Sequence, residues 1–261
     1  INNSTYDVIQ LGEGINLSGT LTINRNVTLD LNGKKLSWHA DKTIVTVSVT
    51  GGNVVIKNGT IYAATYYGRV TKKQTATALA ISGGTVSIDN VTVEAKTGTK
   101  TASGWEAIAL KISNSPIVKI ATSTFTGTRS AYSGDTFGDG YAIQTSLALN
   151  DMLAPGYGFY KNNNLVTSFS GSQSETIEVL ENRYIPTFQT NGGNAVSGDY
   201  SYSISSKLSS LPTPTRAGYA FVGWYYDEAL TQPVSLPMQV TTQSYPTNTT
   251  QITFYAKLFP A

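Results

Sequence analysis

The sequence repeats a phrase of thirteen residues, which occurs at positions 51–63 and again, 32 positions later, at 83–95. Both copies open with a glycine pair, keep apolar residues at the same places and carry a central asparagine, Asn58 or Asn90. A fainter copy follows 32 residues later again, and an upstream copy with shorter spacing lies at 26–38. Repetition at this period is typical of domains built from stacked structural units.

Apolar residues alternate within each copy. Val54 and Ile56 are two positions apart, as are Val86 and Ile88, and a turn residue separates each pair from a second short apolar pair. This period indicates β-strands, because an amphipathic helix needs apolar spacing near about 3.6 over a longer stretch. A further apolar run precedes each copy and predicts strands at 44–49, 77–81, 107–112 and 142–148. Three short strands per unit predict an all-β fold, a parallel β-helix with one continuous core.

The segment 20–38, followed by units such as 53–63, resembles the right-handed β-helix of the pectate-lyase-like superfamily, and the resemblance covers about residues 6–148. It implies a fold rather than a function, because the superfamily includes lyases, hydrolases, phage tailspikes and non-catalytic adhesins. Such helices often stack turn asparagines that form hydrogen bonds from coil to coil. Asn32, Asn58 and Asn90 stand at that position, although the turn preference of asparagine explains them equally well.

Composition narrows the class of protein. The 261 residues include no cysteine, which excludes disulfides and cysteine-based metal sites, and a net charge of +2 without a basic cluster argues against nucleic acid as a partner. No apolar run is long enough to cross a bilayer. The chain begins at Ile1 rather than methionine, so we expect a signal peptide and an anchor outside this segment and an extracellular, cell-surface or wall-associated protein.

The repeat period is lost after residue 127. We expect residues 1–148 to form the β-helix and 149–182 to form a cap or connector with a short helical turn, a strand and an asparagine-rich hairpin turn. A cap covers strand backbone and apolar core that would otherwise invite end-to-end association, so the sequence predicts a monomer. Residues 183–261 would form a separate module.

This last segment closely resembles the Listeria-Bacteroides repeat, the internalin B-repeat-like module. The matching elements are Asn191, Gly192, Gly193, Pro214, Arg216, Gly218, Tyr219, Phe221, Gly223, Trp224, Tyr225 and residues 254–257. Leu258 and Phe259 stand where the family usually has tryptophan, and we expect this apolar pair to fill the same place. The resemblance implies a small β-grasp-like module of extracellular bacterial proteins, often in tandem near the cell wall, without enzyme activity.

The densest aromatic run of the module predicts a strand at 218–226. Strict alternation would place Phe221 on one face with Tyr219 and Tyr225, and Trp224 on the other. In so small a domain, large rings supply much of the buried area. We therefore favour a core position for these aromatics over a sugar-stacking platform.

Catalytic constellations are scarce in the sequence. His39 is the one histidine and has no adjacent acid and nucleophile, so a hydrolytic triad is not indicated. The nearest acidic pair is Asp135 and Asp139, in a glycine-rich stretch that equally fits ordinary turns. These two carboxylates are weak candidates for Ca²⁺, and no other metal or cofactor is indicated.

Aligning the repeats places three long insertions, 65–75, 96–106 and 128–140, at the same corner of successive units. Aromatic and basic residues within them are candidates for ligand binding: Tyr66, Tyr67, Arg69, Lys100, Trp105, Arg129, Tyr132 and Phe137. Aromatic faces beside polar donors suit a polysaccharide or an extended peptide of a host or neighbouring-cell surface protein. The alternative is that these rings only pack the loops against the units.

We therefore expect a non-catalytic bacterial cell-surface or secreted protein, an adhesin or a glycan- or protein-binding β-helix displayed with a wall-proximal spacer module. A polysaccharide lyase or glycoside hydrolase with its active site on the flank of the β-helix is one alternative. A purely structural spacer in a longer tandem array is another.

Overall fold

The computed structural model describes residues 6–65, 74–98, 105–129, 139–184, 186–196, 198, 202–203, 207–239 and 253–261. The described residues form an all-β structure with one short 3₁₀ turn, and the chain divides into two compact units, Ile1–Leu180 and Glu181–Ala261.

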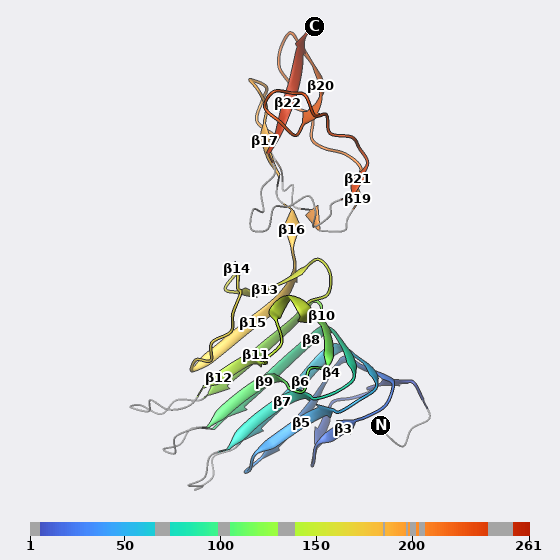
Figure 1. Cartoon of the computed structure of the whole chain (residues 1–261), viewed down its shortest axis with the longest axis vertical. Helices are drawn as coiled ribbons and strands as arrows, with labels where there is room; N and C mark the ends of the chain where they lie inside the picture. The colour runs from blue at the N-terminus through green and yellow to red at the C-terminus, as the bar shows by residue number, and fades with distance from the viewer. Residues whose placement is uncertain are drawn as a thin grey trace. The chain divides into compact units, whose positions relative to one another are not determined.

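Two sheets of parallel strands build the repeats of the first unit, and the chain alternates between them (Figure 1). The first sheet contains, in order, β1 (Val8–Gln10), β4 (Val27–Ala40), β6 (Asn53–Thr65), β8 (Thr85–Thr97) and β11 (Ser123–Arg129), with β2 (Ile15–Leu17) beside β4 and β10 (Ile117–Ile120) beside β8. The second contains β3 (Leu21–Ile23), β5 (Ile44–Val49), β7 (Thr75–Ile81), β9 (Glu106–Ile112) and β12 (Gly140–Gln144). The predicted strand at 44–49 is confirmed, and the other three lie within a few residues of their predicted ends.

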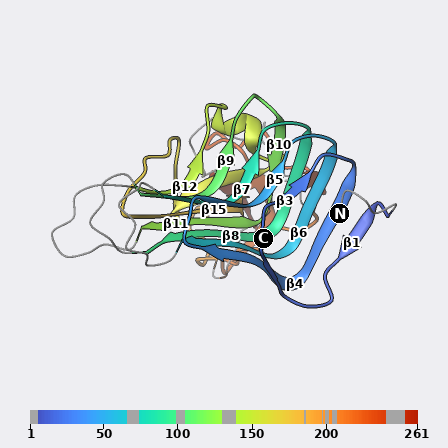
Figure 2. The same cartoon turned by 90° about the horizontal axis from the view of Figure 1, so that it is seen from below.

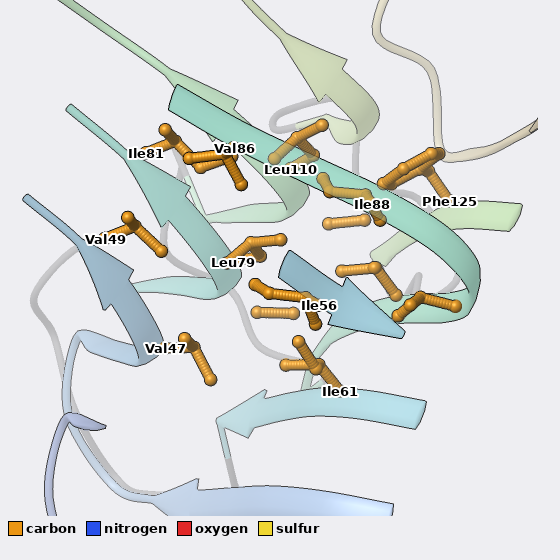
Figure 3. Packing of buried hydrophobic residues seen from close by; sticks show 14 of the residues in the cluster. Val47, Val49, Ile56, Ile61, Leu79, Ile81, Val86, Ile88, Leu110 and Phe125 are labelled. Carbon is orange, nitrogen blue, oxygen red and sulfur yellow. The ribbon is translucent and has the colours of Figure 1, made fainter. Parts of the chain in front are cut away.

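The 32-residue period of the sequence equals the register between β6 and β8, because paired residues of these strands are 32 positions apart. Ile56 pairs with Ile88, and the same row continues to Leu29 on one side and Ile120 on the other. Every one of these four side chains is at most 1% exposed. Figure 3 shows Leu79 of the second sheet beside Ile56 in the shared core. Burial of each such side chain stabilises the fold by about 1.5–3 kcal/mol, so the stacking of identical rows holds the unit together.

The copies differ from the prediction at their centre, where the sequence indicated two strands separated by a turn. In the structure β6 and β8 each continue as one strand through that position, although the ladder skips Asn58 (φ 59°) and Asn90 (φ 54°), where the chain bends. Asparagine tolerates this left-handed conformation better than other side-chain-bearing residues. The third copy follows the prediction, because β10 and β11 are separate strands.

The predicted asparagine ladder is present between two repeats. The Asn90 side-chain amide donates to Asn58 Oδ1 at 3.2 Å, and the Asn58 amide donates to Asp30 Oδ1 at 3.2 Å. The backbone N–H of Asn32 also donates to this carboxylate and, together with Asn58 and Lys57, holds the pKa of Asp30 below its usual range. Asn32 itself departs from the ladder, because its amide donates to the Leu11 carbonyl.

The glycine pairs that open the copies form a second tight corner. Gly52 and Gly84 have φ values of 85° and 84°. A Cβ on Gly84 would lie 2.3 Å from the carbonyl oxygen of Gly52, and one on Gly52 would lie 2.3 Å from the carbonyl carbon of Arg25. Only glycine allows successive repeats to approach this closely.

The C-terminal end of the stack is covered by four elements, η1 (Leu149–Met152), β13 (Tyr157–Lys161), β14 (Asn164–Leu165) and β15 (Ser174–Glu181). They supply the helical turn, strand and hairpin turn that the sequence predicts at 149–182. Strand β15 runs antiparallel to β11. The core ends here with four side chains that are 0–1% exposed: Met152, Phe159, Ile177 and Val179.

A buried carboxylate completes this end. Glu175 is 1% exposed and accepts hydrogen bonds from the backbone N–H of Ala142 in β12 (3.1 Å) and of Ser170 (3.3 Å), while the Lys161 ammonium lies 3.6 Å away. The carboxylate therefore satisfies an edge N–H of β12 that a further strand would otherwise bind.

The second unit is built from short strands: β16 (Arg183–Tyr184), β17 (Thr187–Gln189), β18 (Tyr202–Ser203), β19 (Lys207–Leu208), β20 (Tyr219–Tyr225), β21 (Met238–Gln239) and β22 (Thr253–Pro260). Strand β22 lies between β17 and β20, β16 pairs with β18, and β19 pairs with β21. Its core is formed by Leu208, Trp224, Phe254 and Ala256.

The predicted alternation of β20 is wrong. The ladder between β20 and β22 shifts register between Phe221 and Gly223, and Val222 is 54% exposed. This bulge turns Phe221 and Trp224 toward the same core, where their rings lie 5.5 Å apart. The prediction that these two aromatics are core residues is confirmed.

The Asn191-Gly192-Gly193 turn is also as predicted. Asn191 and Gly192 have positive φ, and the Asn191 amide donates to the Ala256 carbonyl at 2.7 Å, which ties the turn to β22. At the end of β22, Leu258 is half-buried but Phe259 is 60% exposed, so only one of the two apolar residues packs inward.

Candidate binding site at the insertion corner

The chain passes from the first sheet to the second at one corner in every repeat. The first crossing takes only residues 41–43, whereas the later crossings are the three predicted insertions. We call the described residues that flank these insertions the insertion corner: Thr65 and Gln74, Thr97 and Trp105, and Arg129 and Asp139.

The strand ends of the first sheet stack in register at this corner. Thr97 pairs with Arg129, and the pairing of Ala64 with Lys96 places Thr65 beside Thr97. Period-two alternation directs all three side chains to the inner face, after the apolar part of the core has ended. They are 3% (Thr65), 0% (Thr97) and 5% (Arg129) exposed.

Gln74 and Trp105 approach from the second sheet. The pairing of Thr75 with Glu106 makes them neighbours, and both are buried, at 3% and 2% exposure. The Gln74 amide nitrogen donates to the Asp41 carbonyl at 3.1 Å, which ties the corner to the first crossing. Trp105 is buried without belonging to the apolar core cluster.

Four buried side-chain atoms at this corner have no hydrogen-bond partner among the described residues. They are the hydroxyls of Thr65 and Thr97, the carbonyl oxygen Oε1 of Gln74 and the indole nitrogen Nε1 of Trp105. An unpartnered buried polar group costs about 1–3 kcal/mol, and such groups are rare in native proteins. Their concentration at one corner makes these four side chains candidates for contacts with a ligand.

Asp139 and Tyr141 extend the corner toward the end of the stack. The Tyr141 hydroxyl donates to Asp139 Oδ2 at 3.0 Å, and burial followed by this hydrogen bond raises the pKa of Tyr141 to about 12. The ring lies against Gly171, where a Cβ would approach it to 2.2 Å. Tyr141 and Phe169 contribute to a small hollow that is also lined by Gln144 and Thr145.

Seven of the residues predicted from the sequence lie outside the described residues: Tyr66, Tyr67, Arg69, Lys100, Tyr132, Phe137 and Asp135. Trp105 and Arg129 both belong to the insertion corner and both are buried, and ligand binding by them stays a prediction. Sequence reasoning missed Thr65, Gln74 and Thr97. The signal was available for the threonines, because each continues the inward alternation of its strand with a polar residue.

The described residues contain no group of three or more histidine, aspartate or glutamate side chains placed to hold a metal ion. The His39 ring packs against the Tyr62 ring in a tilted arrangement, with the ring centres 5.2 Å apart, and burial followed by the charge of Lys35 lowers the pKa of His39. Within the described ranges, no helix is both long and apolar enough to span a membrane.

Comparison with known proteins identifies one segment. Residues 184–257 match the family model of the Listeria-Bacteroides repeat domain, in agreement with the sequence resemblance. Repeats of this family are typical of bacterial surface proteins. No curated protein and no solved structure matches the chain.

Proposed function

We propose that this chain belongs to a non-catalytic, extracellular bacterial surface protein in which the stacked repeats display a ligand-binding corner and the C-terminal module acts as a wall-proximal spacer. The parallel stack then has the right-handed β-helical form of the pectate-lyase-like superfamily, and the module has a β-grasp-like fold. The matched Listeria-Bacteroides repeat supports the surface location.

The binding proposal rests on the four buried polar atoms at the insertion corner that have no partner in the described part of the chain. They offer two hydroxyls, one carbonyl acceptor and one indole donor. Sugar hydroxyls both donate and accept hydrogen bonds, so a polysaccharide segment can complement such a mixed set without bringing a charge. Sugar rings also stack on aromatic side chains of the kind found in the insertions.

Burial of the corner has a kinetic consequence. Thr97 and Trp105 are almost inaccessible, so a ligand reaches their free atoms only by displacing the groups that cover them. Association rate constants are typically about 10⁵–10⁷ M⁻¹ s⁻¹, and they are lower when binding requires such a rearrangement. We expect slow binding and slow release.

Glycan arrays followed by calorimetric titration of the hits test this function. Trp105→Phe keeps an aromatic ring but removes the indole N–H, and we expect about a tenfold loss of affinity, the effect of one lost hydrogen bond worth about 1.4 kcal/mol. Trp224→Phe is the matched control, because Trp224 belongs to the other unit and already donates to the Pro212 carbonyl at 2.7 Å.

The proposal is contradicted if no glycan binds, or if Trp105→Phe and Trp224→Phe leave the affinity equally unchanged. An extended peptide is the second ligand class, and a peptide array run in parallel distinguishes it. Binding of peptides alone would retain the corner as the site but replace the ligand class.

A further inference from the structure

The two sheets converge toward the insertion corner. Each repeat contributes a strand to each sheet beside this corner, and we call such a pair a rung. In the rung of β11 and β12, a Cβ on Gly127 would lie 2.3 Å from the Tyr141 carbonyl oxygen, and one on Gly140 would lie 2.3 Å from the Gly127 carbonyl oxygen. Only glycine is allowed where two backbones approach this closely. The two sheets are therefore in contact directly before the corner.

The same two rows hold small residues in every repeat with an insertion. Strand register continues both glycine positions into rows of alanine that are at most 1% exposed: Ala63 and Ala95 in the first sheet, and Ala76 and Ala107 in the second. The first repeat, whose crossing is short, has Trp38 and Ile44 at these places. The small residues separate the apolar core from the corner side chains, which stand two positions away on each strand.

The corner is closed at its first end by the short crossing 41–43, which joins the two sheets directly. This crossing is bound to the next rung by two hydrogen bonds. The Gln74 amide donates to the Asp41 carbonyl at 3.1 Å, and the Thr75 N–H donates to the Thr43 hydroxyl at 3.2 Å. The first rung therefore forms a wall across this end of the corner.

The other end is closed by Ser172 and Gln173. The Arg129 N–H donates to the Gln173 carbonyl at 2.9 Å, and the backbone groups of Gly140 and Ser172 exchange two hydrogen bonds. Ser172 and Gln173 are thus bound to both sheets, beside the buried Arg129 side chain. They lead into β15, which lies beside β11 and β12 (Figure 2). The last rung of the corner therefore ends at a second wall.

The four unpartnered polar atoms lie on two neighbouring rungs between these walls. Thr65 and Gln74 belong to one rung, and Thr97 and Trp105 belong to the next. Neighbouring strands of a sheet are about 4.8 Å apart, which is comparable with the distance between hydroxyl groups on opposite sides of a sugar ring. One ring can therefore reach both rungs, whereas a chain that ran along the stack would meet a wall at each end.

We propose that the insertion corner binds the terminal sugar unit of a glycan rather than an internal segment of a polysaccharide. This inference rests on the proposed function and narrows it. Four polar side chains that are at least nine-tenths buried, and that have no partner in the described part of the chain, identify the binding site. The small-residue rows and the two walls leave the side of the insertions as the direction in which the glycan continues.

Calorimetric titration with sugars of different length tests this proposal. The probes are the methyl glycosides of glucose, galactose, N-acetylglucosamine and N-acetylgalactosamine, together with a linear trisaccharide of each. Because a single unit makes the contacts, the preferred methyl glycoside and its trisaccharide should bind with affinities within about threefold of each other. A rise of more than about tenfold from one unit to three would overturn the proposal but leave glycan binding, and hence the proposed function, in place.

The position of the preferred unit provides a second test. One trisaccharide carries this sugar at its non-reducing end and another carries it in the middle, with mannose at the remaining places. We expect the second to bind at least about a hundredfold more weakly, because the bound unit cannot be extended on both sides. Equal affinities would overturn the proposal. Failure of every sugar to bind, on the array and in titration, would contradict the proposed function as well.

Two substitutions show whether both rungs contact the same unit. Thr65→Val and Thr97→Val each remove one unpartnered hydroxyl, and each should weaken the methyl glycoside and the trisaccharide equally, by about tenfold. Thr46→Val is the matched control and should leave both affinities unchanged, because the Thr46 hydroxyl is buried and already donates to the Tyr62 carbonyl. A variant that weakens only the trisaccharide would place separate sugar units on the two rungs and overturn the proposal.

Discussion

The bend at Asn58 and Asn90 and the insertion corner belong to the same repeats but are built in opposite ways. At the bend, successive copies keep the same residue type, and its amides bond from repeat to repeat. At the insertion corner the copies diverge in length and sequence, and four buried polar atoms lack partners among the described residues. The parts of the repeats that stay the same therefore define the architecture, and the corner where the repeats differ is the candidate functional site.

The largest effect is expected where the repeats approach most closely. Gly84→Ala places a methyl group 2.3 Å from the Gly52 carbonyl oxygen, at a φ of 84°. The cost of the left-handed backbone therefore adds to the cost of pushing the Gly52 carbonyl away. We expect a loss of about 3 kcal/mol or more in the free energy of unfolding. Gly33→Ala is the control, with a φ of 71° and no atom near the new Cβ, and should cost only about 1 kcal/mol. Equal losses of unfolding free energy for the two variants in a denaturant titration would show that the close approach of Gly84 to Gly52 does not matter for stability.

The asparagine bend can be dissected with two substitutions. Asn58→Ala removes the bonds to Asp30 and Asn90 and puts alanine at a φ of 59°, for an expected loss of about 2 kcal/mol. Asn58→Gly removes the same bonds but relieves the strain, for an expected loss of about 1 kcal/mol. If Asn58→Gly is as stable as the parent, the ladder contributes nothing beyond turn preference.

A pair of isosteric substitutions compares a satisfied with an unsatisfied hydroxyl. Thr46 and Thr97 are both 0% exposed, but Thr46 donates to the Tyr62 carbonyl at 3.0 Å whereas the Thr97 hydroxyl lacks a described partner. Thr97→Val should raise the free energy of unfolding by about 1 kcal/mol, and Thr46→Val should lower it by about as much. A loss of stability in both variants would mean that the Thr97 hydroxyl is satisfied after all.

The smallest effect concerns Tyr141, whose pKa is raised from 10.0 to about 12, by burial first and then by Asp139. A folded-state pKa above the unfolded value favours the neutral form, so this stabilisation is complete below pH 10 and is lost as the pH rises through 12. Tyr141→Phe should weaken the decline in stability over that range. Asp139→Asn should lower the Tyr141 pKa in an ultraviolet titration, and an unchanged pKa would exclude Asp139 as a cause.

Most of the architecture could be predicted from the sequence because it repeats. The register of Ile56 with Ile88 is the repeat offset itself, and the alternation that predicts the strands is the alternation that buries them. The bulge at Val222 could not be predicted, because β20 is not repeated in the sequence and only the tertiary core turns both Phe221 and Trp224 inward.

The candidate site was predictable in position but not in chemistry. Alignment located the corner and singled out Trp105 and Arg129, yet it treated their aromatic and basic character as the signal. Gln74 and Thr97 matter for a different reason, since their buried polar atoms depend on which neighbours come close in three dimensions. A single sequence does not contain that information.

The indole N–H resonance of Trp105 in a ¹H–¹⁵N spectrum, followed during titration with a ligand that binds, tests the binding corner most directly. Trp224 is an internal reference, because its indole already donates to Pro212. We predict a saturable shift of the Trp105 resonance and slowed exchange of its proton with water, while the Trp224 resonance stays in place. A bound ligand that leaves the Trp105 resonance unmoved would contradict the assignment of the insertion corner as the binding site.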